Sequence, residues 1–121
     1  LIITQIKFHI MEQSVYIFGQ MAVKSYDDYF TQYGLPFLPI LEKFNGKLLA
    51  ATKNGRTLEG DAFGNWTVLM QFPSKEMAYG FVTSKEYAPL MELRVNELTD
   101  GAHAVLIPAE ITPIKENYRK I

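Results

Sequence analysis

Apolar positions along the chain change between two periodicities, which separates segments expected to form strands from segments expected to form helices. The segment 15–23 (VYIFGQMAV) is rich in strand-forming residues and almost continuously apolar, as in a strand covered on both faces. In 65–72, large apolar residues alternate with Thr67, Leu69 and Gln71, which predicts a strand with one strongly apolar face. Shorter runs at 48–53 and 102–107 predict two more strands.

Helical spacing begins after the first predicted strand. Ser25 is a suitable N-cap, and the apolar residues that follow recur at intervals of three and four. These residues are Tyr26, Tyr29, Phe30, Tyr33, Phe37, Leu41 and Phe44. Pro36 and Pro39 each remove a backbone donor, so we expect a kink or a break near 35–38. Asn45 and Gly46 predict the end of this helix.

The remaining segments alternate between turns and helices. The Asn54–Gly55 pair predicts a tight hairpin or the end of a strand, and the glycine-containing stretch 56–64 predicts a loop. Two further helical segments are expected, at 74–82 and 85–98. Asp100 and Gly101 are expected to end the second one before the last strand.

The resulting order, βαββαβ, predicts an α+β fold of the ferredoxin-like kind, with a four-stranded antiparallel sheet that carries its helices on one face. The other face would then be bare. The strands 15–23 and 102–107 are apolar on both alternating sets of positions, so the bare face would expose an apolar patch. Patches of this kind usually mark interfaces, which predicts a homodimer formed through the sheet face.

Composition agrees with one ordinary domain. The chain has 121 residues, of which 48% are hydrophobic and 21% charged, and these values are typical of globular proteins. We place the domain at 11–108, with 1–10 as a non-native or extra segment before Met11 and 109–121 as a C-terminal tail. A formal net charge of −1 disfavours nucleic acid as a partner. The lack of cysteine and of any membrane-spanning run fits a cytoplasmic protein.

The region 72–94 resembles the signature of the bacterial domain-of-unknown-function family 1330. The residues that carry this resemblance are Phe72, Pro73, Ser74, Glu76, Ala78, Phe81, Ser84, Glu86, Tyr87, Leu90, Leu93 and Arg94. Weaker elements extend the likeness over roughly 15–107. It implies a dimeric α+β barrel, a superfamily that also holds cofactor-free monooxygenases, lactone isomerases, haem-handling enzymes and small-molecule sensors. The arginine common on the family's second strand is replaced here by Ala51 or Thr52.

Tyr87 and Arg94 are the leading candidates for a binding site, because a spacing of seven residues puts both on one helical face. Arg94 could clamp a carboxylate or enolate while the Tyr87 hydroxyl orients or protonates it. The alternative is that Tyr87 is a core residue and that Arg94 is solvated or pairs with Glu97 or Glu59. Buried aromatics and solvated arginines are the commoner case, which favours this alternative.

Four other residues are candidates for chemistry or binding. Glu59, in the predicted loop, and His103, at the start of the last predicted strand, are the candidate general bases. Trp66 and Tyr16 are candidate ligand-binding residues that could equally belong to the core or to the dimer interface. No pair of histidines at metal-ligand spacing and no phosphate loop is present, so we expect neither a metal nor a cofactor.

Three functions remain open on this basis. The first is a dimeric protein that binds a small apolar or carboxylate-bearing metabolite in a pocket between sheet and helices. The second is a cofactor-independent enzyme that acts as a monooxygenase or isomerase. The third is a structural dimerisation or interaction module whose tail reaches a partner. Whether the protein is an enzyme is therefore undecided by the sequence.

Overall fold

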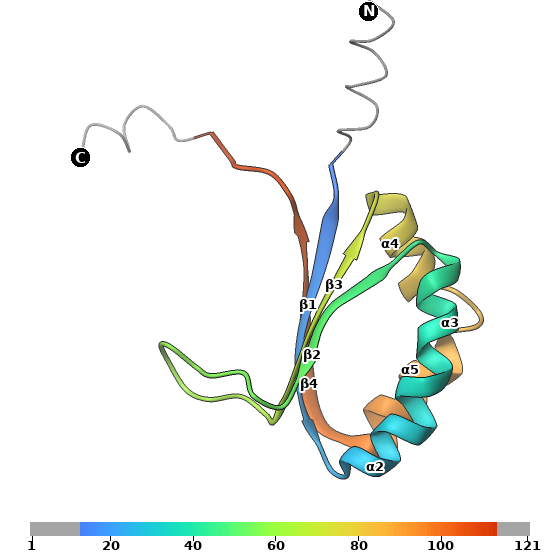
Figure 1. Ribbon diagram of the computed structural model, residues 1–121, viewed down its shortest axis with the longest axis vertical. Helices are drawn as coiled ribbons and strands as arrows, with labels where there is room; N and C mark the ends of the chain where they lie inside the picture. The colour runs from blue at the N-terminus through green and yellow to red at the C-terminus, as the bar shows by residue number, and fades with distance from the viewer. Residues whose placement is uncertain (1–12, 114–121) are drawn as a thin grey trace, which may run out of the picture.

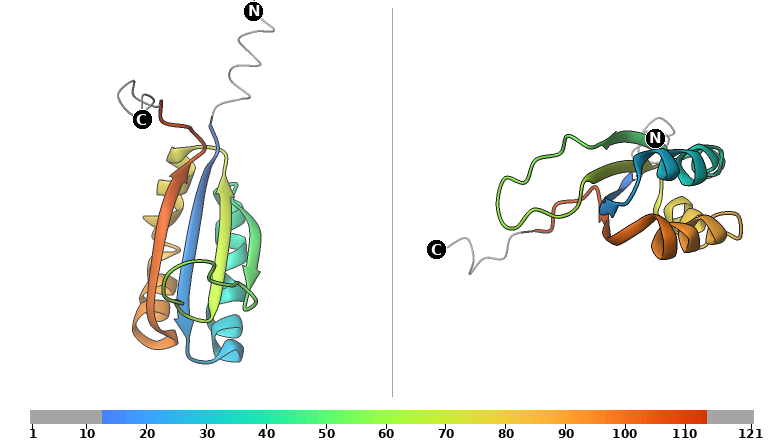
Figure 2. Two further views of the ribbon diagram at one scale, coloured as in Figure 1. Left: turned by 90° about the vertical axis from the view of Figure 1, so that its left-hand side faces the viewer. Right: turned by 90° about the horizontal axis from the view of Figure 1, so that it is seen from below.

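The computed structural model describes residues 13–113, which form one antiparallel sheet with all helical segments on one of its faces (Figures 1 and 2). The sheet has four strands in the order β2-β3-β1-β4. Their bounds are β1 (Val15–Val23), β2 (Lys47–Thr52), β3 (Trp66–Phe72) and β4 (Thr99–Pro108). The segment 1–10, expected to be extra or non-native, and most of the predicted tail lie outside the described residues.

Two helical runs cross the sheet. The run between β1 and β2 consists of α2 (Tyr26–Tyr29), the π-helix η1 (Phe30–Gly34) and α3 (Leu35–Lys43). The run between β3 and β4 consists of α4 (Lys75–Val82), α5 (Ala88–Leu93) and the π-helix η2 (Arg94–Leu98). This arrangement is the predicted ferredoxin-like α+β fold. Among the described residues, no helix is long and apolar enough to cross a membrane.

The alternation of β1 explains which side chains reach the core. Its odd-numbered residues are buried beneath the helices and its even-numbered residues are only partly covered. The register pairs Ile17 with Met70 of β3 and with Leu106 of β4, so these side chains share the helix-covered face. Phe18 pairs with Leu69 and Val105, which lie on the opposite face, here called the helix-free face.

The first helical run is irregular, but the irregularity lies one turn before the predicted kink at 35–38. The Leu35 N–H bonds the Phe30 carbonyl, five residues back, which widens the helix into the π-turn η1. Pro36 and Pro39 then sit within an otherwise α-helical α3. A proline ring clashes with the carbonyl four residues before it, so the hydrogen bonding of the helix changes in the turn before the proline.

One predicted boundary was wrong, the start of the last strand. β4 begins at Thr99, so Asp100 and Gly101 lie inside the strand instead of ending the helix. Gly101 has φ of +135°, close to a register shift opposite the end of β1, where glycine tolerates the irregular backbone.

Asn54 and Gly55 follow the end of β2 at Thr52, in agreement with the predicted strand end, and they form no tight hairpin. The chain leaves the sheet there and returns at Trp66, after a loop that projects on the helix-free side (Figures 1 and 2). Asn65 anchors the end of this loop to β1. Its side-chain oxygen accepts from the Val23 N–H at 2.8 Å and its side-chain amide donates to the Val23 carbonyl at 3.0 Å. This anchor fixes the start of β3 next to the end of β1.

Candidate functional site

A cavity of about 820 Å³ lies between the sheet and the helices. Small residues at helix-facing positions of the sheet create it, because they do not fill the distance to the helical layer. These are Gly19 on β1, Ala51 on β2, and Ala102 and Ala104 on β4. Large side chains at the same positions would close this space, as they do towards the Phe72 end of the sheet.

Gly19 shows that the space above the sheet centre is open. A Cβ atom there would meet only ordinary contacts, the nearest being the His103 carbonyl oxygen at 3.7 Å and the Ala104 Cβ at 3.8 Å. No atom of the helical layer lies within 4 Å of that position. Glycine in a central strand commonly marks a place where another group approaches the backbone closely. We therefore treat Gly19 as the floor of the cavity.

Tyrosine hydroxyls line the wall of the cavity that the helices form. The Tyr33 and Tyr87 hydroxyl oxygens are 2.6 Å apart and hydrogen-bonded, and both residues are buried. Burial, and then the neighbouring Tyr87 hydroxyl, raise the pKa of Tyr33 well above its ordinary value. Burial also raises the pKa of Tyr29 to about 12, against the opposing effect of the Arg94 charge. The phenols of Tyr29 and Tyr33 are therefore neutral and act as hydrogen-bond donors or acceptors, not as bases.

Arg94 brings a positive charge to the same wall from η2. Its guanidinium carbon lies 5.8 Å from the centre of the Tyr33 ring, a cation–π arrangement. Burial by itself lowers the pKa of Arg94, but the Tyr87 and Tyr33 hydroxyls outweigh it and hold that pKa above its ordinary value. The ion pairs between described residues are Lys24–Asp100 and Lys43–Glu86. Arg94 thus carries its charge without a carboxylate partner in the described part of the chain.

Two buried N–H groups in this region lack an acceptor among the described residues. They are Nε of Arg94 and Nε1 of Trp66, and both side chains line the cavity. The Trp66 ring packs against Tyr26 and Tyr29, with ring centres 5.8 Å apart in each pair. Buried donors are nearly always hydrogen-bonded in native proteins, so these two nitrogens are exceptions within the described residues.

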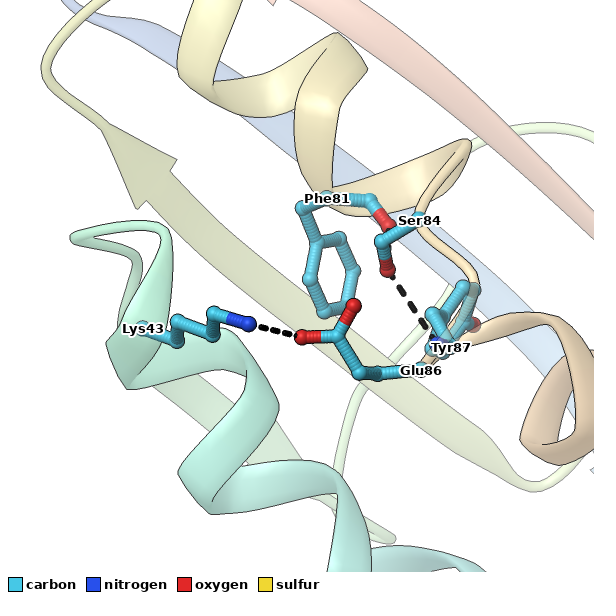
Figure 3. Close-up of polar contacts among 5 residues, drawn as sticks. All are labelled: Lys43, Phe81, Ser84, Glu86 and Tyr87. Atoms are coloured by element: carbon cyan, nitrogen blue, oxygen red, sulfur yellow. Dashed lines mark hydrogen bonds and ion pairs between the residues drawn. The ribbon is translucent and has the colours of Figure 1, made fainter.

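The turn before α5 holds Tyr87 in place (Figure 3). The Ser84 Oγ accepts from the Tyr87 N–H at 3.1 Å and donates to the Phe81 carbonyl at 2.9 Å. Glu86, next along the chain, forms an ion pair with Lys43 at the end of α3, and the hydrogen bond from Lys43 lowers the pKa of the Glu86 carboxyl. These contacts tie the second helical run to the first and set the direction of the Tyr87 side chain.

Three of the predicted ligand-binding residues, Tyr87, Arg94 and Trp66, line the cavity together. Arg94 makes no ion pair with Glu97 or Glu59 and is half-buried, so of the alternative for Arg94 only the ion pair is absent among the described residues. Tyr87 is buried as the core alternative required, yet it also borders the cavity.

Tyr16 and the two predicted bases are placed elsewhere. Tyr16 pairs with Gln71 and Ile107 on the helix-free face, so it does not line the cavity. Glu59 is exposed in the projecting loop and does not line the cavity. His103 borders the cavity, but it is exposed and its register opposite Gln20 puts its side chain on the helix-free face. There its ring centre lies 4.4 Å from that of Phe63, with the two rings tilted by 57°. Strand alternation directs the Tyr16 and His103 side chains to the helix-free face, and Glu59 lies in the projecting loop.

Tyr33 and Tyr29 belong to the site although we did not predict them as site residues. The signal was present: the buried stripe of the first helical run contains tyrosines where leucine or phenylalanine would bury equally well. A hydroxyl on a core-facing stripe needs a polar partner, and here that partner comes from the second helical run. No group of three or more metal-binding side chains gathers within residues 13–113.

The family model described as "Domain of unknown function (DUF1330)" matches residues 14–108, most of the described chain. The chain belongs to the DUF1330 family. None of the curated proteins matches it in sequence. The resemblance seen in residues 72–94 is thereby confirmed at the level of the family.

Solved structures share the fold of this DUF1330 protein. The RPA0582 protein of unknown function from Rhodopseudomonas palustris has a TM-score of 0.64 at 14% identity, over 93% of each chain. Its methylated form has a TM-score of 0.63 at 13% identity, over 95% of this chain and 91% of that one. A dabb family protein with a ferredoxin-like fold from Mesorhizobium loti has a TM-score of 0.49 at 7% identity, over 86% of this chain and 100% of that one.

Proposed function

We propose that this DUF1330 protein binds a small molecule carrying a carboxylate or a similar acceptor group in the cavity between sheet and helices. The observation that carries the proposal is the Arg94 guanidinium, which lines the cavity and forms no ion pair among the described residues. A ligand carboxylate that reaches the guanidinium would neutralise the arginine charge.

The rest of the lining supports an otherwise apolar ligand. Aromatic and aliphatic side chains from both helical runs and from the sheet surround the polar groups. A few convergent polar groups in an apolar cavity is the usual composition of a small-molecule site. In the hydrogen bond between the Tyr33 and Tyr87 hydroxyls, one phenol donates and the other accepts. The proton of the accepting phenol remains free to orient a bound oxygen.

An enzymatic alternative, cofactor-independent oxygenation or isomerisation, requires a base beside the ligand. Glu59 and the imidazole of His103 lie away from the site, and the raised pKa values of Tyr29 and Tyr33 make these phenols poor bases. Asp27 is the carboxylate that borders the cavity within the described residues. The enzymatic alternative therefore rests on Asp27, and the binding function rests on Arg94 and Trp66.

The protein is also proposed to act as a homodimer through the helix-free face, as in a dimeric α+β barrel. Apolar side chains from three strands gather there without helices to cover them. They are Tyr16 and Phe18 on β1, Leu69 on β3, and Val105 and Ile107 on β4. Val105 and Ile107 are exposed in the single chain, and burying such a patch against a second copy would remove it from water.

The binding function is tested by titrating the protein with carboxylic acids and with the primary amides of the same acids. Trp66 is the only tryptophan and lines the cavity, so its fluorescence reports occupancy directly. We expect acids to bind more tightly than their amides, and Arg94→Gln to remove that preference. Arg56→Gln is the matched control, because Arg56 lies exposed in the projecting loop. Equal affinity of the Arg94→Gln and Arg56→Gln proteins for the acids would contradict the proposal.

A further inference from the structure

The outer part of the cavity is bordered by apolar side chains that are open to solvent. Phe30 and Leu38 come from the first helical run, and Met91 and Val95 come from the second. Their exposed fractions range from 42% for Leu38 to 56% for Phe30. We call these four residues the rim. Single exposed apolar residues are common, but a group that shares one cavity forms a continuous apolar surface.

The inner part of the same cavity has the opposite character. Arg94 Nε and Trp66 Nε1 are buried and unpartnered among the described residues, and the Tyr33–Tyr87 hydroxyl pair lies beside the arginine. The buried donors therefore lie inside, and the four rim residues give the outer part an apolar surface, beside the exposed charged side chains of Asp27 and Lys53.

We infer that the ligand is an amphiphilic monocarboxylic acid that enters with its acid group first and lays an apolar chain or ring system against the rim. The inference rests on the proposed binding function and adds the size and the direction of the ligand. A short acid would satisfy the inner donors but leave the rim in water. An extended apolar tail would cover the rim, and each methylene group that it buries there would add affinity.

The volume of the cavity agrees with an extended ligand. About 820 Å³ falls within the range of sites that enclose drug-sized molecules, whereas a short acid fills only a small part of such a space. Gly19, Ala102 and Ala104 keep the floor flat, so a chain or ring can pass from the inner end to the rim.

The test uses straight-chain acids from butanoate to dodecanoate, each paired with the alcohol of the same length, below their micelle concentrations. Binding is followed by Trp66 fluorescence and by calorimetry. We expect the affinity for acids to rise by up to about fourfold for each added methylene that contacts the rim. The alcohols are expected to bind more weakly at every length, because they do not neutralise Arg94.

Variants separate the two ends of the ligand. The double variant Leu38→Ser, Met91→Ser is expected to flatten the dependence on chain length while short acids still bind. Its matched control is Leu35→Ser, Met77→Ser, because these residues are also exposed but do not line the cavity. Arg94→Gln is expected to do the reverse, removing the preference for acids and keeping the dependence on length. Thermal unfolding of each variant establishes that it is folded.

The outcomes distinguish failure of the inference from failure of the proposed function. If short and long acids bind the wild-type protein equally, or if the rim variant and its control behave alike, the inference is wrong and the binding function stands. If no acid binds, or acids and alcohols bind equally at all lengths, the carboxylate site itself is wrong. A length dependence lost only in the rim variant, with the acid preference lost only in Arg94→Gln, supports both.

Discussion

The hydroxyl oxygens of Tyr33 and Tyr87 lie 2.6 Å apart inside the protein, although 54 positions separate the two residues in the sequence. This hydrogen bond joins the first helical run to the turn before α5. The same two phenols flank the guanidinium of Arg94, so the bond that links the runs also shapes the polar end of the cavity. A contact that holds the two helical runs together therefore also borders the proposed binding site.

Replacing Tyr87 with phenylalanine should destabilise the protein by about 1–2 kcal/mol, because the buried Tyr33 hydroxyl loses its partner. The double variant Tyr33→Phe, Tyr87→Phe should lose less than the sum of the single changes, since neither hydroxyl is then left unpaired. Urea unfolding measures both. Tyr79→Phe is the control, because Tyr79 is exposed. Additive losses in the double variant would mean that the two hydroxyls do not interact.

The stability of the protein should fall at alkaline pH. Tyr29 has an ordinary pKa of 10.0 when unfolded and of about 12 when folded, so between these values the folded state holds a proton that the unfolded state releases. This contribution is complete below pH 10 and is lost as pH rises, by about 1.4 kcal/mol per pH unit. Urea unfolding at about pH 9 and about pH 11 measures it. Tyr29→Phe should depend less on pH, and an unchanged dependence would contradict the prediction.

Gly64 and Gly60 should differ sharply in their tolerance of alanine. Both have positive φ, +68° and +83°, but a Cβ on Gly64 would lie 2.3 Å from the Met21 carbonyl oxygen, whereas a Cβ on Gly60 meets nothing within 4 Å. Gly64→Ala should destabilise by more than about 2 kcal/mol and Gly60→Ala by about 1 kcal/mol. Thermal and urea unfolding of the two proteins compare them. Similar losses would show that the end of the loop is not fixed against β1.

Filling the cavity should abolish binding without unfolding the protein. Ala104→Leu places a larger apolar side chain over the open floor next to Gly19, where the helices leave room. We expect a change in stability of less than about 1.5 kcal/mol and at least a tenfold loss of affinity for acids. Ala88→Leu is the control, since Ala88 is exposed and does not line the cavity. Retained binding in Ala104→Leu would place the site elsewhere.

A charge on the helix-free face should dissociate the proposed dimer. Wild-type protein is expected to show twice the chain mass of 13.8 kDa by light scattering after gel filtration. Val105→Glu should shift it towards the monomer, because burying an unpaired carboxylate in the interface is unfavourable. Leu35→Glu, equally exposed at 49% but on the helical layer, should leave the dimer intact. A wild-type protein with the mass of a single chain would contradict the proposed dimer.

The sequence by itself determined the order of elements and the face that each one buries. Periods of two and of three to four along the chain report local geometry, so the strands and the stripe from Tyr29 to Leu41 could be predicted from neighbouring residues alone. The spacing of Tyr87 and Arg94 is also local, and it correctly placed both on one side of the second helical run.

Only the tertiary structure decided which of these residues meet. The Tyr33–Tyr87 bond, the approach of Arg94 to Tyr33 and the shared cavity with Trp66 join segments far apart in the chain. Strand register, in turn, removed Tyr16 and the His103 side chain from the site, because a neighbour one position along a strand points to the opposite face. The hollow over Gly19 is likewise a property of several strands and helices together, since no single segment encodes a space between layers.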